Sequence, residues 1–186
     1  MTVSPDLDAR FREAAADAGL LDAAYDLTDS PIGTLLVAAT DRGLCRISFF
    51  PDVESTRERL AHDFGPRVLR AAKPVDRARK ELGEYFAGRR TVFDVDLDLR
   101  AIPEFHVQVL RELAQVPYGQ LTTYGTLAKR VGHPSAARAV GTVMNRNRIP
   151  IVLPCHRVIG ANGKLVGYAG GLDVKERLLR LEGALL

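Results

Sequence analysis

The sequence contains few cysteines, and this scarcity limits what they can do. Only two occur in 186 residues, Cys45 and Cys155, and they are 110 positions apart without a CxxC pair. This pattern supports neither a disulfide framework nor a zinc knuckle. The four histidines are scattered and form no HxxxH pair, so we expect no metal site.

Long apolar runs are also missing. The longest, such as GTLLVAA and IPIVL, are far shorter than the roughly 20 residues that cross a bilayer. The N-terminal stretch MTVSPDLDARFREAAADAG is too charged for a secretory signal. The hydrophobic content of 46% is enough to fill a core. We therefore expect a globular cytoplasmic protein of one large domain or two small ones, without membrane association.

The modest net charge of +3 hides an asymmetry between the two halves. Residues 1–100 carry 15 Lys/Arg against 18 Asp/Glu, whereas residues 101–186 carry 11 against 5. A basic C-terminal half suits an anionic partner, but it is equally compatible with an ordinary solvated surface.

The N-terminal half reads as a small α/β unit. A helix is predicted over 4–19, with Ser4 or Asp6 as its N-cap. Strands are predicted over 23–30, 33–40 and 43–50, separated by the turn signals SPIG and TDRG, which indicates an antiparallel meander. Cys45 lies within the third of these strands, and we interpret it as a structural residue.

Two helices and a strand complete this unit. The helices are predicted over 52–65 and 74–88, the second with Val75, Ala78 and Leu82 on one face. The alternation in TVFDVDLDL, residues 91–99, predicts a closing strand.

From residue 103 onward the pattern is helical. A helix over 103–117 precedes two short helices, over 122–132 with Thr123 as N-cap and over 133–147 with Pro134 near the first turn. This spacing suits a helix-turn-helix, although any two packed helices look similar. In the second helix, Arg138, Thr142 and Asn145 share one face.

Cys155 follows this helix pair in the segment PCHRV. A thiol becomes a nucleophile only as thiolate, which needs a cation, a histidine or helix N-terminal amides nearby. His156 and Arg157 are candidates, and Glu182 is the nearest isolated acid that could orient the histidine. The residues alone leave two readings open for Cys155: a buried structural thiol or a nucleophile.

Three stretches together resemble a known family. PCHRVIG, with TTYGTLAKRVGHPSAARAVG before it and GYAGGLDVKERLLRLEG after it, closely resembles the O6-alkylguanine-DNA alkyltransferases, also called methylated-DNA–protein-cysteine methyltransferases. The resemblance extends from about Tyr25 to Gly183 and includes DSPIGTLLVAATDRGL and YFAG.

The resemblance implies an α/β (α+β) fold with two domains. The N-terminal domain is expected to be a small antiparallel sheet with helices, similar to ribonuclease H. The C-terminal domain is expected to be mostly helical, with a winged-helix-like helix-turn-helix and the active-site loop. We place a helical extension at 1–22, the first domain at 23–100 and the second at 101–186.

The resemblance also implies the activity. Members transfer an alkyl group, such as methyl, irreversibly from O6-alkylguanine in DNA to a cysteine, with O4-alkylthymine as a second candidate substrate. Each molecule acts once and needs no cofactor. The implied partner is double-stranded DNA containing alkylated guanine, bound through the minor groove with the base flipped out. We expect a monomer, which could bind DNA cooperatively.

Residue roles follow from the same resemblance. Cys155 corresponds to the alkyl acceptor, His156 to the histidine that deprotonates it through a water, and Glu182 to the carboxylate that orients the histidine. Tyr124 corresponds to the tyrosine that helps flip the nucleotide and donates a proton to the leaving guanine, and Arg138 to the arginine that fills the gap in the stack. Further DNA-contacting positions are Thr123, Ser135, Ala137, Gly141 and Asn145. Residues that brace the active-site loops or line the guanine pocket are Asn147, Pro150, Val158, Gly167, Tyr168, Ala169 and Lys175.

Two positions depart from the family pattern. Arg148 follows Asn147 where the family usually has proline, which restores an N–H and flexibility to that turn. Ala169 stands where several relatives carry serine or glycine, so a backbone amide would have to serve the guanine oxygen. Two alternative functions therefore remain open besides repair. The protein could recognise damaged DNA without transferring the alkyl group, or it could be a regulator that senses alkylation through Cys155.

Overall fold

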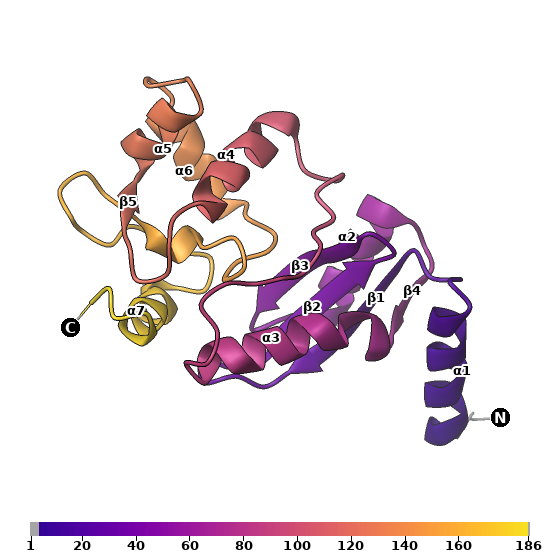
Figure 1. The fold of residues 1–186 in the computed structure, drawn as a ribbon. Coiled ribbons are helices and arrows are strands. Elements are labelled where there is room, and N and C mark those ends of the chain that lie inside the picture. Colours follow the sequence, from indigo (N-terminus) through magenta and orange to yellow (C-terminus); the bar gives the residue numbers. More distant parts are fainter. Residues whose placement is uncertain (1–3, 186) are drawn as a thin grey trace. The chain divides into compact units, whose positions relative to one another are not determined.

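A computed structural model describes residues 4–185 of the chain (Figure 1). It contains two compact units: an N-terminal unit, which extends to residue 85 and also includes residues 94–101, and a C-terminal unit of residues 86–93 and 102 onward. The predicted N-terminal extension contains helix α1 (Pro5–Asp17), and Ser4 is its N-cap because its hydroxyl accepts a hydrogen bond from the Leu7 amide at 3.3 Å. Residues 1–3 of that extension, and residue 186 of the predicted second domain, lie outside the described part.

The N-terminal unit is built on a four-stranded sheet in the order β3-β2-β1-β4. The first three strands are β1 (Ala23–Thr28), β2 (Leu35–Thr40) and β3 (Gly43–Phe49), and they pair antiparallel as the turn signals predict. The fourth, β4 (Val68–Arg70), pairs parallel with β1, so the sheet is mixed and not wholly antiparallel. A strand of three residues has no periodicity of its own that the sequence could reveal.

Helices cover both faces of this sheet. Helix α2 (Val53–Phe64) packs Leu60 into a core with Tyr25, Leu36 and other residues of β1 to β4. Alternate residues of β1 point to the other face. There the 3-10 turn η1 (Lys73–Val75) leads into α3 (Asp76–Phe86), and Arg79 of α3 pairs with Asp26 of β1 at 2.8 Å.

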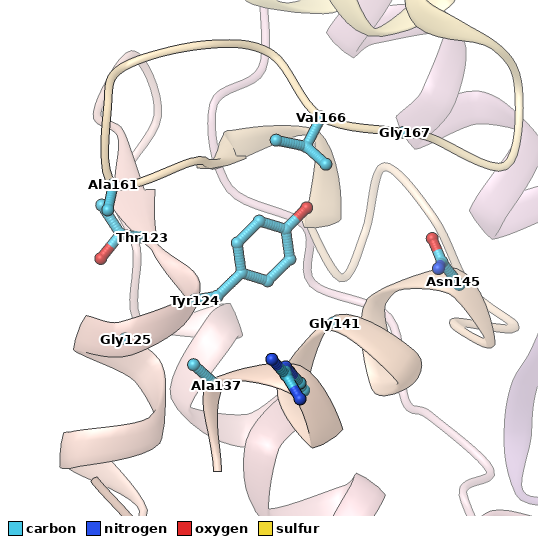
Figure 2. Close-up of a pocket in the computed structure, with 10 residues that line it drawn as sticks. Thr123, Tyr124, Gly125, Ala137, Gly141, Asn145, Ala161, Val166 and Gly167 are labelled. Atoms are coloured by element: carbon cyan, nitrogen blue, oxygen red, sulfur yellow. The ribbon is translucent and has the colours of Figure 1, made fainter. Parts of the chain in front are cut away.

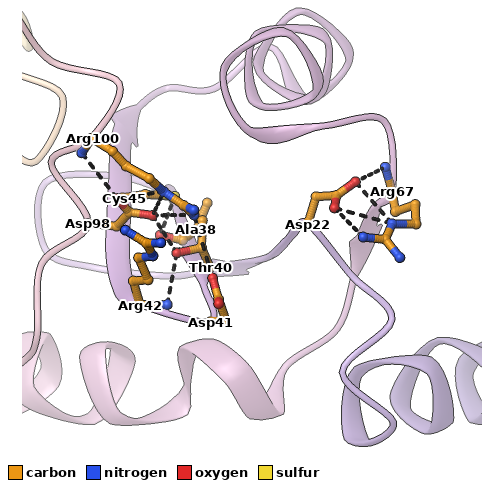
Figure 3. A network of polar contacts seen from close by, with 9 residues as sticks. All are labelled: Asp22, Ala38, Thr40, Asp41, Arg42, Cys45, Arg67, Asp98 and Arg100. Carbon is orange, nitrogen blue, oxygen red and sulfur yellow. Dashed lines mark hydrogen bonds and ion pairs between the residues drawn. The ribbon is translucent and has the colours of Figure 1, made fainter.

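The predicted strand over 91–99 is wrong. The segment makes only one bridge to the sheet, between Leu97 and Leu44, within the described residues. Side chains hold the rest of it in place of a ladder: the Asp94 amide donates to Glu81 at 2.8 Å, and the buried Asp98 carboxylate accepts from Thr40 at 2.6 Å and from Arg100 (Figure 3). The alternation therefore reflects the partial burial of Phe93, Val95, Leu97 and Leu99, and strand pairing is limited to the one bridge.

Cys45 is a buried residue of β3, as predicted. Its thiol donates to the Ala38 carbonyl at 3.3 Å, next to the Asp98 network (Figure 3). Burial, reinforced by the negative charge of Asp98, raises the pKa of this thiol to about 12. A thiol held in its neutral form is unreactive as a nucleophile, so Cys45 fills space in the core.

Four helices and a two-stranded sheet form the elements of the C-terminal unit: α4 (Glu104–Ala114), β5 (Thr122–Thr123), α5 (Tyr124–Arg130), α6 (Ala137–Asn145), β6 (Val158–Ile159) and α7 (Leu172–Leu181). The expected α+β class, with a helical second part, is confirmed. Among the described residues, none of the helices is both long enough and apolar enough to cross a membrane.

The helix pair α5 and α6 differs from the prediction at one end. Thr123 caps α5 as expected, since its hydroxyl accepts from the Thr126 amide at 3.1 Å. Pro134, however, lies in the turn before α6 and not in its first turn. The hydrogen bond from the Ala136 amide to the His133 carbonyl closes this turn, so the helix begins only at Ala137.

Removal of the Leu60 side chain should test the N-terminal core. Leu60 is fully buried between α2 and the sheet, so Leu60→Ala is expected to lower the free energy of unfolding by about 2–5 kcal/mol through lost burial and a residual cavity. Urea denaturation followed by circular dichroism would measure this. Leu7→Ala removes an exposed leucine of α1 and should change stability by less than about 0.5 kcal/mol. Equal losses in the two variants would refute the assigned core.

Candidate active site

A pocket of about 490 Å³ lies along α5, α6 and the loop after β6 (Figure 2). Its lining contains seven of the predicted DNA-contacting or pocket residues, namely Thr123, Tyr124, Ala137, Arg138, Gly141, Asn145 and Gly167. Gly125, Ala161 and Val166 also line it and were not predicted. Among the described residues the lining does not include Ser135, Pro150, Val158, Tyr168, Ala169 or Lys175.

Tyr124 contributes the aromatic side chain of this pocket. Figure 2 shows its ring extending from the start of α5 toward Val166 on the opposite loop. A Cβ at Gly141 would lie 3.9 Å from the ring, so glycine leaves the α6 backbone open beside it. Burial raises the pKa of the phenol, and the nearby Cys155 adds to this rise. The hydroxyl therefore remains protonated at neutral pH and can donate a hydrogen bond.

The exposed face of α6 is polar, and its inner face is apolar. Arg138, Thr142 and Asn145 are exposed, whereas Val140 and Val143 are buried. The small residues of the helix leave its backbone accessible, since Ala139 is exposed and Ala137 and Gly141 are half-buried. This arrangement can lie close to a polyanion.

Cys155 begins a 3-10 turn, η2 (Cys155–Arg157), that leads directly into β6. Strand β6 pairs parallel with β5, with Thr122 opposite Val158 and Thr123 opposite Ile159. Because Tyr124 follows β5 and Arg157 precedes β6, this short ladder fixes the start of the helix pair against the end of the cysteine turn. The sequence did not predict either strand.

The chain before Cys155 is held by Asn147. The Asn147 amide group donates to the Leu153 carbonyl at 2.7 Å and to the Cys155 sulfur at 3.2 Å, and its oxygen accepts from the Ile149 amide at 3.0 Å. Ile151, which is fully buried within this loop, has a φ of 75°. A β-branched residue is strained in that conformation, so the surrounding contacts must impose it.

Cys155 itself is buried, with 4% of its surface exposed. Burial raises the pKa of the thiol to about 11, although the Asn147 hydrogen bond and the charge of Lys175 oppose the rise. The resting residue is therefore a thiol that needs a base before it can act as a nucleophile.

His156 and Glu182 meet in the interior. His156 Nε2 lies 2.8 Å from Glu182 Oε1, and both side chains are fully buried. Burial lowers the pKa of His156 more strongly than the Glu182 contact raises it, so the ring is neutral. Nδ1 is buried without a hydrogen-bond partner among the described residues. A neutral ring that donates from Nε2 to the carboxylate presents a free lone pair at Nδ1, which is the arrangement of a general base.

Arg157 binds the same carboxylate and was not predicted to do so. Its Nε lies 2.8 Å from Glu182 Oε2 and its Nη2 lies 2.9 Å from Oε1, while Nη1 donates to the Val116 carbonyl at 2.6 Å. Burial alone would raise the pKa of Glu182, but the hydrogen bonds from His156 and Arg157 prevail and lower it to about 2. The sequence placed Arg157 beside the thiol as a possible cation; the structure pairs it with Glu182.

Lys175 braces the loop after β6. Its ammonium group is buried and donates to the Val158 carbonyl at 2.6 Å and to the Val166 carbonyl at 2.9 Å. Burial lowers its pKa. Tyr168, half-buried, lies edge-on to the His156 ring at 6.5 Å between centroids.

The remaining predicted positions lie outside these contacts. Pro150 is buried and forms a bridge with Leu153, whereas Ser135 and Ala169 are exposed. Arg148 is half-buried beside Asn147, and the Asn147 bonds form without proline at that position. No group of three or more His, Cys, Asp or Glu side chains is arranged to hold a metal ion within residues 4–185.

Comparison with known proteins agrees with this geometry. Residues 23–99 match the ribonuclease-like domain of 6-O-methylguanine DNA methyltransferase, and residues 104–184 match its DNA binding domain. The chain is 44% identical over 160 residues to a methylated-DNA–protein-cysteine methyltransferase of Methanosarcina acetivorans, covering 86% of this chain and 98% of the relative. A Mycolicibacterium paratuberculosis protein of the same name is 47% identical over 160 residues, covering 85% and 91%.

Solved structures give the same assignment. The crystal structure of Mycobacterium tuberculosis O6-methylguanine methyltransferase superimposes with a TM-score of 0.76 at 40% identity, covering 87% of this chain and 93% of that one. Its complex with DNA gives the same values. Fold and site therefore define a methyltransferase that carries its own acceptor cysteine. The chain belongs to the 6-O-methylguanine DNA methyltransferase family, which confirms the resemblance noted from the sequence.

The Glu182 contacts predict a pH-dependent stability. The ordinary pKa of the group is 4.5 and folding lowers it to about 2, so the ionised carboxylate stabilises the fold fully above about pH 5. This stabilisation is lost as the pH falls through 2. Glu182→Gln should cost about 3 kcal/mol near pH 7, because it leaves the Arg157 guanidinium buried without its counter-charge.

Urea unfolding of both proteins between pH 7 and pH 2 would measure the difference. The difference in free energy of unfolding between the unmodified protein and Glu182→Gln should shrink steadily below pH 5. Glu176→Gln, in α7 just before Glu182 but in an exposed pair with Arg180, serves as the control and should cost less than about 1 kcal/mol. A difference for Glu182→Gln that stays constant across this range would contradict the depressed pKa.

Proposed function

We propose that this protein repairs DNA by moving an alkyl group, such as methyl, from O6 of guanine to the sulfur of Cys155, once per molecule. The observation that carries the proposal is a buried thiol followed directly by a neutral, carboxylate-bound histidine in one 3-10 turn, which is paired through β6 and β5 to the start of a helix pair. Relatives that are 44% and 47% identical to this chain are named methylated-DNA–protein-cysteine methyltransferases.

The thiol proton leaves first. His156 Nδ1 carries the free lone pair of the site, and it accepts the proton of Cys155 through a bridging water. Glu182, ionised and fixed, stabilises the imidazolium that forms. Asn147 holds the sulfur by its amide hydrogen, which favours the thiolate over the thiol.

The sulfur then attacks the alkyl carbon. A carbon–sulfur bond forms as the carbon–O6 bond breaks, and the electron pair of that bond passes to the guanine. Tyr124 donates a proton to the guanine as this charge develops. The proton taken from the thiol then returns to the Tyr124 oxygen and restores its hydroxyl. The net change is Cys155 thiol plus O6-alkylguanine to S-alkyl-Cys155 plus guanine. A thioether has no good leaving group, so the molecule does not turn over.

The substrate base must leave the duplex to reach the thiol. Flipping costs a few kcal/mol, less for a pair weakened by alkylation. The pocket between α6 and the loop after β6 has room for a base, with Tyr124 across it. Arg138, exposed on α6, is positioned to fill the vacated space in the stack.

DNA would approach the exposed face of α6. Ala137 and Gly141 permit a close approach to the minor groove, and phosphate contacts should make binding weaken with salt. A relative of 40% identity has been crystallised with DNA. The partner we propose is double-stranded DNA containing alkylated guanine. All proposed catalytic residues come from one chain, which supports action as a monomer.

The cellular location we propose is the cytoplasm. Both cysteines of the protein are free and buried. Repair requires Cys155 as a thiol, and a reducing compartment keeps it so.

Mass spectrometry of the acceptor peptide tests the proposal. After incubation with a duplex containing one O6-methylguanine, the peptide with Cys155 should gain one methyl group, with at most one methyl per protein molecule. Cys155→Ser should gain none. Cys45→Ser, which removes the buried thiol of β3, should still be labelled at Cys155. Tight binding of the duplex without any methyl gain in the unmodified protein would show damage recognition without repair.

Tyr124→Phe tests proton donation. The ring remains in the pocket but the hydroxyl is lost, so the single-turnover rate constant should fall about 100-fold, the lower end of the usual contribution of a general acid. Affinity for the alkylated duplex, measured by fluorescence anisotropy, should change less than about twofold, because the hydroxyl acts when charge develops on the leaving base. An unchanged rate constant would remove Tyr124 from the chemistry.

A further inference from the structure

The turn between α4 and β5 contacts the end of α7 at two consecutive residues. The turn is closed by the hydrogen bond from the Gln120 amide to the Pro117 carbonyl at 3.1 Å. Its Tyr118 hydroxyl donates to the Leu181 carbonyl at 2.9 Å, and its Gly119 amide donates to Glu182 Oε2 at 3.2 Å. The turn therefore binds both the backbone and the carboxylate at the end of this helix.

Glycine is required at position 119 for two separate reasons. Its φ is +75°, which side chains other than hydrogen rarely permit. In addition, a Cβ at this position would lie 2.8 Å from the Glu182 carbonyl oxygen. That oxygen belongs to the backbone and cannot rotate away as the end of a side chain could. A larger residue at 119 must push the turn and Glu182 apart.

The two oxygens of the Glu182 carboxylate have different hydrogen-bond partners. Oε2 accepts from the Gly119 amide and from Arg157 Nε, whereas Oε1 accepts from Arg157 Nη2 and His156 Nε2. The turn also stabilises Arg157, whose guanidinium lies 5.9 Å from the centre of the Tyr118 ring and donates to the Val116 carbonyl next to the turn. The orientation of Oε1 toward the histidine thus depends on residues 116–119.

We propose that Gly119 is a positioning residue for alkyl transfer: its amide and its lack of a side chain hold the Glu182 carboxylate so that Oε1 fixes His156. This inference rests on the function proposed above. Gly119 touches neither the thiol nor the pocket lining; it acts through Glu182 on the histidine. Displacement of Glu182 would release His156 Nε2, and Nδ1 would then no longer be held in the orientation and protonation state of the base.

The test uses Gly119→Ala with Gly88→Ala as its matched control. Gly88 has a similar φ of +69°, but a Cβ there would meet nothing within 4 Å, so this variant carries the backbone strain without the clash. Single-turnover transfer from a duplex with one O6-methylguanine gives two readouts: the amplitude counts folded molecules, and the rate constant reports the chemistry. Gly119→Ala should lower the rate constant about 10- to 100-fold, which is at most the lower end of the usual contribution of general-base catalysis, because Gly119 acts on the base only through Glu182. Gly88→Ala should change it less than about twofold, and the affinity of Gly119→Ala for DNA should also stay within about twofold.

A second comparison separates positioning from general damage. If Gly119 acts through Glu182, then Gly119→Ala should have little further effect on the rate constant in a Glu182→Gln protein, because the charged carboxylate that Gly119 positions is already absent. If the clash only loosens the fold, the two effects should multiply. Multiplying effects, or equal rate constants for Gly119→Ala and Gly88→Ala, would overturn the inference.

Failure of this inference is distinguishable from failure of the proposed function. If the unmodified protein takes up no methyl group at all, the proposed function fails. If it is labelled and Gly119→Ala is labelled at the same rate, only the inference fails.

Should Gly119→Ala yield no folded protein, Tyr118→Phe tests the same turn. This variant removes the hydrogen bond from the Tyr118 hydroxyl to the Leu181 carbonyl and keeps the ring against Arg157. It should lower the rate constant about threefold with unchanged amplitude. An unchanged rate constant in that variant would also refute the inference.

Discussion

The carboxylate of Glu182 accepts hydrogen bonds from segments far apart in the chain: the turn after Cys155, through His156 and Arg157, and the turn before β5, through Gly119. A buried charge destabilises a protein unless its partners are complete and well placed. These segments can therefore meet in only a few ways, and in the one observed the neutral His156 ring, directly after Cys155 in the chain, is bound to this carboxylate. The arrangement that we propose for catalysis follows from the need to satisfy one buried anion.

A second buried charge organises the other side of the site. The ammonium of Lys175 donates to the carbonyls of Val158 and Val166, and so ties the start of β6 to the middle of the loop that follows it and borders the pocket. The β5 and β6 pairing and the Asn147 hydrogen bonds hold the segments around Tyr124 and Cys155. Because backbone and buried charges maintain each of these positions, the exposed face of α6 can be used for binding without carrying the stability of the site.

The sequence predicted those parts of this protein that have a local pattern. Amphipathic spacing predicted helices α1 to α6 but not α7, alternation predicted three strands of the sheet, and the PCHRV segment drew attention to Cys155. The family resemblance, and not spacing, supplied the roles of Tyr124 and Arg138. The choice of Glu182 came from chemistry as well, since it is an isolated acid and a histidine base needs an orienting partner.

Features that depend on distant contacts could not be predicted. Strands β5 and β6 have two residues each, too short for any period, and they exist only because residues 122–123 and 158–159 meet. The segment 91–99 shows the opposite error, since its alternation is real but its backbone pairs with the sheet only at the single bridge to Leu44 and is also held by the Glu81 carboxylate. Arg157 and Gly119 act on a carboxylate 25 and 63 positions away, and no local signal marks that pairing.

In the proposed mechanism the buried Glu182 carboxylate makes His156 a base for Cys155. This role is tested by the single-turnover rate constant of Glu182→Gln with a duplex containing O6-methylguanine, measured together with the affinity for that duplex. The rate constant should be lower by about 100-fold, with nearly unchanged affinity and an amplitude that accounts for all folded protein. A rate constant within about twofold of the unmodified protein would contradict this role.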